Sequence, residues 1–162
     1  MTRREWLEEA GRWLRQAEHN REVAVHDRAG GFHSAACFWA QQAAEVGLKA
    51  FLYARGFDVR GHSVADLAQR AAELDPDFGR LAEEAAPLDQ YYIPTRYPNG
   101  VAAPTIPARV FDRRDSDRAL ELAGRTLDVV ARKIEFLRAW LKEAERKKCE
   151  RAGDVGGFAT GF

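Results

Sequence analysis

Hydrophobic residues recur every three or four positions through most of the chain, which is the period of an α-helix that buries one face. The first such run predicts a helix from about Arg4 to about Asp27, ended by the glycines at positions 30 and 31. Its apolar positions, set among charged residues, are Trp6, Ala10, Trp13, Leu14, Ala17 and Ala24.

The second run predicts a helix from about Phe32 to about Arg55 that is hydrophobic around nearly its whole circumference. A helix of this kind has to be surrounded by protein, so we expect it at the centre of the fold. Gly56 provides its stop signal.

Two shorter helices follow. The third opens at His62 and Ser63 and ends before Pro76, which cannot continue a helix. The fourth is predicted from apolar positions spaced by three and four up to Tyr92. Pro87 lies inside it, so we expect a kink or a fresh start there.

The last third of the chain combines an irregular connection with one long helix. Residues 94–114 hold four of the six prolines and show no helical period. A connection of this length in a compact domain is usually functional. From about Asp115 to Leu141 the three-four alternation is unbroken, and we expect this seam to pack within the bundle and along a second copy.

No run shows the alternation of a half-buried strand, and no internal repeat is visible. We therefore expect an all-α fold, an antiparallel up-and-down bundle of four to five helices. It forms one domain over residues 1–149, and the glycine-rich residues 150–162 form a flexible tail.

The composition limits which partners and which cellular compartment fit this chain. Acidic and basic residues balance at 25 each, so any contact with a polyanion has to be local. With only Cys37 and Cys149, a disulfide scaffold is disfavoured and a reducing, cytoplasmic setting fits. The longest apolar run, residues 35–40, is far short of the roughly 20 residues that cross a bilayer. We expect a soluble protein without a membrane partner.

Residues 91–98 gather three tyrosines, two prolines and an arginine where the helical period ends. Because proline fixes φ and donates no N–H, Arg96 and Tyr97 are held in a restricted, non-helical geometry. The guanidinium fork suits phosphate or carboxylate, and rings beside it can stack on a base. The structural alternative is that Tyr91 and Tyr92 close a helix onto the core while Arg96 meets a carboxylate.

Three polar residues stand on one side of the hydrophobic second helix. Gln42, Glu45 and Lys49 fall within an arc of about 60° at 100° per residue. Buried polar groups cost free energy unless each finds a partner. Glu45 and Lys49, spaced i, i+4 with the acid first, can neutralise each other. Otherwise the three form a polar wall that meets Arg96 and a ligand.

The histidines and cysteines suggest little chemistry by themselves. His62 precedes the third helix, where a capping or solvent role is favoured over a ligand role. His19, His26 and His33 with Asp27 invite a metal site, but rings seven residues apart are too far for one ion to join. Cys37 lies in an apolar run, where a thiolate is disfavoured. No glycine-rich phosphate loop, catalytic triad or cofactor motif is present.

Three blocks of sequence resemble the HEPN domain, the higher-eukaryote and prokaryote nucleotide-binding family. They are Phe38-Trp39-Ala40-Gln41-Gln42-Ala43-Ala44-Glu45 continuing to Lys49, the turn Gly61-His62-Ser63-Val64, and Tyr92-Ile93-Pro94-Thr95-Arg96-Tyr97-Pro98. The resemblance spans about Trp6 to Leu141. It implies a dimeric helical bundle that often acts with a minimal nucleotidyltransferase in toxin–antitoxin or defence pairs. It also implies binding of nucleotides or RNA.

Many relatives are metal-independent endoribonucleases with an arginine followed, after four to six residues, by a histidine. Arg96 matches the arginine, but no histidine follows His62 in the chain, so the general acid/base is absent from its place. Arg28 and His33 have the right spacing but flank the first interhelical turn, and we interpret their spacing as chance.

The sequence thus favours a non-catalytic HEPN-type homodimer that binds a nucleotide or a nucleotidyltransferase partner. The expected binding residues are Gln42, Glu45, Lys49, Tyr92, Arg96 and Tyr97. One alternative is an active ribonuclease that uses Arg96 with His62 or with the His33 of a dimer mate. A second is a dimeric scaffold whose polar cluster only fixes helix register.

Overall fold

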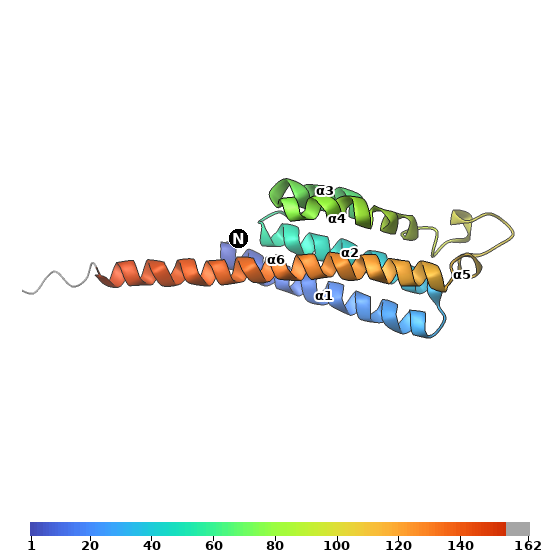
Figure 1. Ribbon diagram of the computed structural model, residues 1–162, viewed down its shortest axis with the longest axis horizontal. Coiled ribbons are helices and arrows are strands. Elements are labelled where there is room, and N and C mark those ends of the chain that lie inside the picture. Colours follow the sequence, from blue (N-terminus) through green and yellow to red (C-terminus); the bar gives the residue numbers. More distant parts are fainter. Residues whose placement is uncertain (155–162) are drawn as a thin grey trace, which may run out of the picture.

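Three long helices run alongside one another, and two shorter ones cover one side of them (Figure 1). The computed structural model describes residues 1–154, which contain six α-helices and no strand. The long helices are α1 (Arg3–Ala29), α2 (His33–Ala54) and α6 (Arg113–Asp154); the others are α3 (Val64–Leu74), α4 (Gly79–Ala85) and α5 (Pro107–Val110). The predicted all-α bundle is confirmed. The sixth helix is α5, a single turn inside the predicted irregular connection.

The ends of the helices follow from local sequence. Thr2 begins α1 with a capping box, in which its side chain and that of Glu5 each accept a backbone hydrogen bond from the other residue. Gly31, at φ +83°, and Gly56, at φ +89°, end α1 and α2 in a conformation that other residues rarely adopt. Ser63 caps α3, accepting from the backbone of Asp66.

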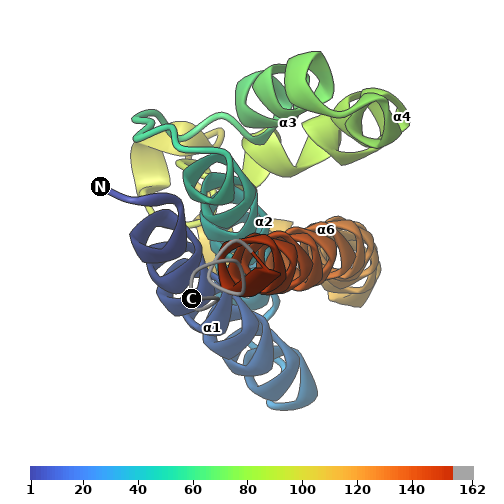
Figure 2. The ribbon, with the colours of Figure 1, turned by 90° about the vertical axis from the view of Figure 1, so that its left-hand side faces the viewer.

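The central position predicted for α2 is confirmed. Viewed along the bundle, α2 lies between α1, α6 and the pair α3 and α4 (Figure 2). Its buried side chains face all of these neighbours, as the nearly continuous apolar surface of this helix requires.

Pro87 acts as the sequence predicts. The α-helix α4 ends at Ala85, and a 3₁₀ segment, η2 (Ala86–Tyr91), continues the chain. Proline removes the backbone donor that a further α-helical turn needs, so the chain tightens at this point. Arg96 follows this segment, and its guanidinium lies over the ring of Phe38 on α2.

The apolar seam of α6 packs inside its own bundle, with Ala123, Leu127, Val130 and Ile134 buried. The C-terminal part of this helix projects past the other helices (Figure 1). It continues to Asp154, into the region predicted as tail, with ion pairs that join Arg146 to Glu143 and Glu150 in these last turns. The other residues of the predicted tail, 155–162, lie outside the described residues. Within residues 1–154 no helix is long and apolar enough to cross a membrane.

Candidate functional site

Glu45 is the centre of a buried polar cluster on α2. Its side chain is 3% exposed, and Oε1 lies 2.8 Å from Lys49 Nζ and 3.1 Å from His62 Nδ1. Oε2 accepts hydrogen bonds from Gln42 Nε2 at 3.0 Å and Gln41 Nε2 at 3.3 Å. These four contacts occupy both carboxylate oxygens, so the buried charge is compensated and Glu45 organises its neighbours.

His62 extends this cluster toward the surface. Gly61, at φ +110°, turns the chain so that the His62 carbonyl accepts from Gln41 Nε2 at 2.9 Å. The imidazole stacks on the ring of Tyr92, with centroids 4.9 Å apart and planes 15° from parallel. The side chain is 59% exposed even though Nδ1 meets the buried Glu45. His62 therefore joins the interior carboxylate to solvent.

Arg96 is held against aromatic rings. Its Cζ lies 4.4 Å from the ring centroid of Phe38, 4.8 Å from that of Tyr92 and 5.1 Å from that of Tyr97. Its Nε donates to the Tyr92 carbonyl at 2.8 Å. In the described part of the chain neither terminal nitrogen of Arg96 has a hydrogen-bond partner, so the fork can receive an anion.

The turn before Arg96 is fixed from the inside. Thr95 is buried, and its hydroxyl donates to the Tyr91 carbonyl at 2.5 Å. Gly100 approaches the backbone of Pro94 so closely that a Cβ there would lie 2.8 Å from the Pro94 Cα. Burial raises the pKa of Tyr91 to about 12, so its hydroxyl stays protonated.

A continuous polar and aromatic row therefore crosses this side of the molecule, and we call it the Arg96 row. It consists of Lys49, Glu45, Gln42, His62, Tyr92, Arg96 and Tyr97. It contains every residue predicted to bind a ligand. Glu45 reaches Lys49 directly, whereas its connection to Arg96 runs through the stacked rings of His62 and Tyr92.

Sequence reasoning missed two members of this neighbourhood. Gln41 supports both Glu45 and the His62 carbonyl, and Phe38 forms one of the rings under Arg96. Gln41 was detectable as a second amide in an otherwise apolar helix. Phe38 carried no signal, because an aromatic residue on a core helix normally just packs.

His33 is not part of this row. Its Nδ1 lies 2.9 Å from Ser116 Oγ at the start of α6, and the neighbouring Arg28 pairs with Asp117. The residues with ribonuclease-like spacing thus fasten the turn between α1 and α2 to α6. Of the two histidines considered for catalysis, His62 is the one in contact with the Arg96 row.

Other candidate chemistry is limited. Burial raises the pKa of the Cys37 thiol to about 12, in line with the disfavoured thiolate predicted from its apolar run. Across residues 1–154, no group of three or more His, Cys, Asp or Glu side chains could hold a metal ion.

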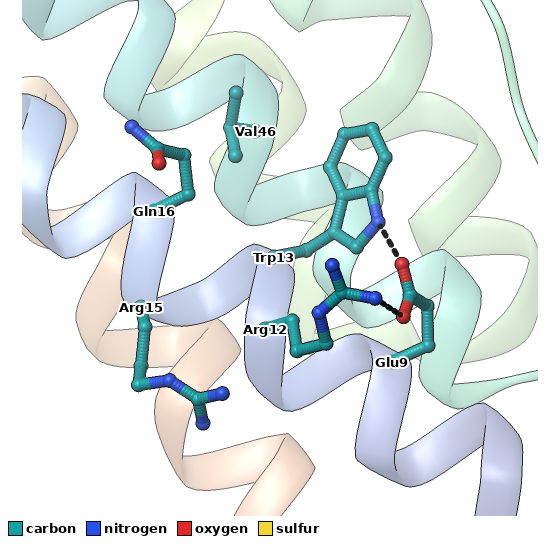
Figure 3. A pocket seen from close by; sticks show the side chains of 6 residues that line it. All are labelled: Glu9, Arg12, Trp13, Arg15, Gln16 and Val46. Atoms are coloured by element: carbon teal, nitrogen blue, oxygen red, sulfur yellow. Dashed lines mark hydrogen bonds and ion pairs between the residues drawn. The ribbon is translucent and has the colours of Figure 1, made fainter.

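A cavity of about 580 Å³ lies elsewhere, on the surface of α1 and α2 (Figure 3). Glu9 accepts from Trp13 Nε1 at 3.1 Å and from Arg12 at 2.8 Å, so these polar groups satisfy one another. The lining residues are Glu9, Arg12, Trp13, Arg15, Gln16 and Val46, none of which belongs to the Arg96 row. The cavity is therefore a different surface from the candidate site.

Comparisons with known proteins agree with the helical-bundle fold. The sequence model of the HEPN domain family matches residues 10–134. The crystal structure of TT1696 from Thermus thermophilus is similar at 43% identity and a TM-score of 0.70, covering 76% of this chain and 97% of that one. The crystal structure of ST0689, an archaeal HEPN homologue, is similar at 34% identity and a TM-score of 0.64, covering 77% and 97%. No curated protein matches the chain.

Proposed function

The chain belongs to the HEPN domain family, and from this premise we propose that it binds a nucleotide, free or in RNA, through the Arg96 row. The observation that carries the proposal is how the side chain of Arg96 is held. Its guanidinium is fixed by three rings and one backbone carbonyl, and its terminal nitrogens are left for an anion. A preorganised cation of this kind binds phosphate without ordering a flexible side chain first.

The residues around Arg96 would have different roles in binding. Tyr97 is 50% exposed, so its ring can stack on a base. Tyr92 already stacks with His62 and contacts Arg96, so it supports the site more than it presents a free ring. Glu45 and Lys49 are buried and bonded to each other, and Glu45 holds His62 and Gln42 in place beneath the ligand.

Calorimetric titration with ATP, GTP and a short single-stranded RNA tests this proposal. Arg96→Ala removes the phosphate contact and weakens binding by roughly tenfold to a hundredfold, the value of a hydrogen bond to a charged group. Arg109→Ala, at an exposed arginine of α5, serves as the matched control and keeps wild-type affinity. Equal binding heats for the wild-type protein and Arg96→Ala would remove the Arg96 row from consideration.

A metal-independent endoribonuclease is the second candidate, favoured by the 3.1 Å contact between Glu45 and His62. When His62 donates Nδ1–H to Glu45, its Nε2 carries a lone pair that can accept a proton. Nε2 takes the proton of an RNA 2′-OH as that oxygen attacks the adjacent phosphorus. Arg96 stabilises the phosphoryl charge, and the 5′ oxygen leaves with the bonding pair and is protonated by water.

Cleavage of single-stranded RNA in EDTA distinguishes the two candidates. If the second holds, the wild-type protein cuts and His62→Ala does not, while His33→Ala cuts like the wild-type protein. Binding without cleavage leaves the first candidate. Equal cleavage by the wild-type protein and His62→Ala would assign the activity to a contaminant.

The proposal also includes a homodimer and a minimal nucleotidyltransferase partner, which the family resemblance implies. Because the middle of the α6 seam, Ala123, Leu127, Val130 and Ile134, is buried in its own bundle, a dimer has to use more exposed residues of this helix. Phe136 and Trp140 on α6 are 66% and 51% exposed, and they are our candidates for that contact. Co-purification of the product of an adjacent nucleotidyltransferase gene with the tagged chain tests the partner.

A further inference from the structure

We infer that Asp89 is the positioning residue of this surface: it fixes the turn that carries His62 against the segment that carries Tyr92. The inference rests on the proposed function, because it concerns the shape of the same surface. Asp89 lies in the 3₁₀ segment η2, just before the third block of sequence that resembles the family and outside all three blocks.

The Asp89 carboxylate closes the start of α3. Oδ1 accepts from the backbone N–H of Val64 at 2.6 Å. Oδ2 accepts from the hydroxyl of Ser63 at 2.8 Å and from the N–H of Ala65 at 3.2 Å. The first amides of a helix have no partner within it, and the helix dipole favours a negative charge at this end. These bonds therefore join η2 firmly to α3.

The backbone on each side of this junction carries one ring of the site. His62 directly precedes Ser63, and the N–H of Tyr92 lies 3.4 Å from the Asp89 carbonyl oxygen. One residue thus connects the turn holding the imidazole with the turn holding the phenol. The two rings meet at 4.9 Å and 15°, a geometry that depends on the relative position of the two backbones.

The other restraints do not replace Asp89. Gln41 holds the His62 carbonyl to α2 and Glu45 holds the His62 ring, but no side-chain bond of either residue reaches Tyr92. The side-chain hydrogen bonds of Asp89 all go to residues 63–65, so it acts on a ligand only through His62 and Tyr92. Loss of the carboxylate frees the two turns to separate, and Arg96, which rests on the Tyr92 ring and carbonyl, moves with one of them.

A matched control stands on α3, the helix whose start Asp89 closes. Asp66 lies in the first turn of α3 and its side chain is exposed, so Asp66→Asn removes one negative charge near the helix N-terminus without breaking the junction. Asp89→Asn removes a charge at the same end and also places an amide N–H₂ against backbone donors. Because both variants remove one charge at this helix end, any difference between their effects comes from loss of the junction and not from the helix dipole.

Proton NMR of the histidine rings tests the inference without any ligand. The chain has four histidines, and His62→Gln assigns the His62 signals. In the wild-type protein the Tyr92 ring current shifts them away from the positions of an exposed histidine; in Asp89→Asn they return toward those positions, and in Asp66→Asn they stay. Unchanged His62 signals in Asp89→Asn, with the fold retained by circular dichroism, would overturn the inference.

Two further measurements complete the test. Ser63→Ala removes one of the three bonds of Asp89, together with the cap that Ser63 gives to the Asp66 N–H. It should shift the His62 signals in the same direction by less, which covers the case in which Asp89→Asn fails to fold. Calorimetry with ATP should show affinity at least fivefold lower for Asp89→Asn and unchanged for Asp66→Asn. If the wild-type protein binds no nucleotide, the proposed function fails, whereas the NMR result still decides the role of Asp89.

Discussion

Glu45 carries a charge into the middle of an apolar helix, where it is tolerated only because every polar neighbour is turned toward it. Lys49 at 2.8 Å is the partner that neutralises it. A buried ion pair contributes little net stability, yet removing one member leaves an uncompensated charge. The pair is therefore better understood as a device that fixes the positions of His62 and Gln42.

This balance gives a prediction for single and double variants. Lys49→Met alone leaves Glu45 without its cation and should lower the free energy of unfolding by about 3 kcal/mol. The double variant Glu45→Gln, Lys49→Met removes both charges and should fall within about 1 kcal/mol of the wild-type protein. Urea denaturation measures both. A double variant less stable than Lys49→Met would mean that the hydrogen bonds of Glu45, and not its charge, govern stability.

Gly47, which has no side chain, sets the close contact of α2 with α6. A Cβ at Gly47 would lie 2.5 Å from Leu127 Cδ2 and 3.7 Å from the Cβ of Ala17 on α1. Gly47 thus lets three helices approach at one level. Leu127 is itself buried, so it has little room to move aside.

Gly47→Ala should consequently destabilise the protein by about 1–2 kcal/mol, because overpacking outweighs the gain in helix propensity. Gly79→Ala is the control. Gly79 has helical φ and ψ of −59° and −47°, and a Cβ added there would meet no atom within 4 Å, so alanine should stabilise the protein by about 0.5–1 kcal/mol. Thermal unfolding compares the two. Equal effects would show that the α2–α6 contact adapts without cost.

A second contact, between the turn before α4 and α6, is electrostatic. Lys133 Nζ lies 2.9 Å from Asp75 and also pairs with Asp77. Burial acts to raise the pKa of Asp75, but the hydrogen bonds from Lys133 and from the Asp77 backbone outweigh it and hold that pKa below its usual value. The same hydrogen bonds to Asp75 and Asp77 raise the pKa of Lys133.

The contact should therefore stabilise the protein across neutral pH. A carboxylate with a lowered pKa contributes stability that is complete above its unfolded pKa of about 4 and is lost as the pH falls through the folded value. Lys133 loses its contribution only as the pH rises above about 10.4. Asp75→Asn should lower Tm by about 2–4 °C at pH 7, for a loss of about 1 kcal/mol, and by less at pH 3. A Tm difference independent of pH would assign the effect to capping by Asp75, whose side chain also accepts from the Asp77 backbone.

At the scale of the molecule, the bundle has one long helix that its own chain does not fully cover. α6 projects beyond the other helices and exposes Phe136 and Trp140, the second of which carries the guanidinium of Arg3 at 5.0 Å from its ring. Phe136 and Trp140 stand four residues apart on one face of α6, so they form a single apolar surface at which a second copy can pack.

Sedimentation velocity at micromolar concentration should accordingly show a dimer. The double variant Phe136→Lys, Trp140→Lys should sediment as a monomer, because two cations would be buried at the contact. Lys148→Glu changes an exposed charge on the same helix and should leave the dimer intact. A wild-type monomer would remove the homodimer from the proposal, and a dimeric double variant would move the interface to another surface.

The local sequence determined the helices of this protein and the composition of its candidate site. Period, capping residues and stop signals predicted α1, α2, α3 and the start of α6 within a few residues, since these signals act over one or two turns. The end of α6, at Asp154, lies well beyond the predicted seam, which ended at Leu141. The polar strip on α2 and the segment around Arg96 were also visible, because buried-looking charge and paired prolines stand out against an apolar pattern.

Tertiary structure decided which of these residues meet. The stacking of His62 on Tyr92, the ring of Phe38 under Arg96 and the three bonds of Asp89 to the start of α3 join segments 24 or more residues apart. No periodicity records such contacts, because they depend on how whole helices pack. The sequence by itself specifies helices that carry polar residues on their surfaces. Packing around α2 brings those residues together in the Arg96 row.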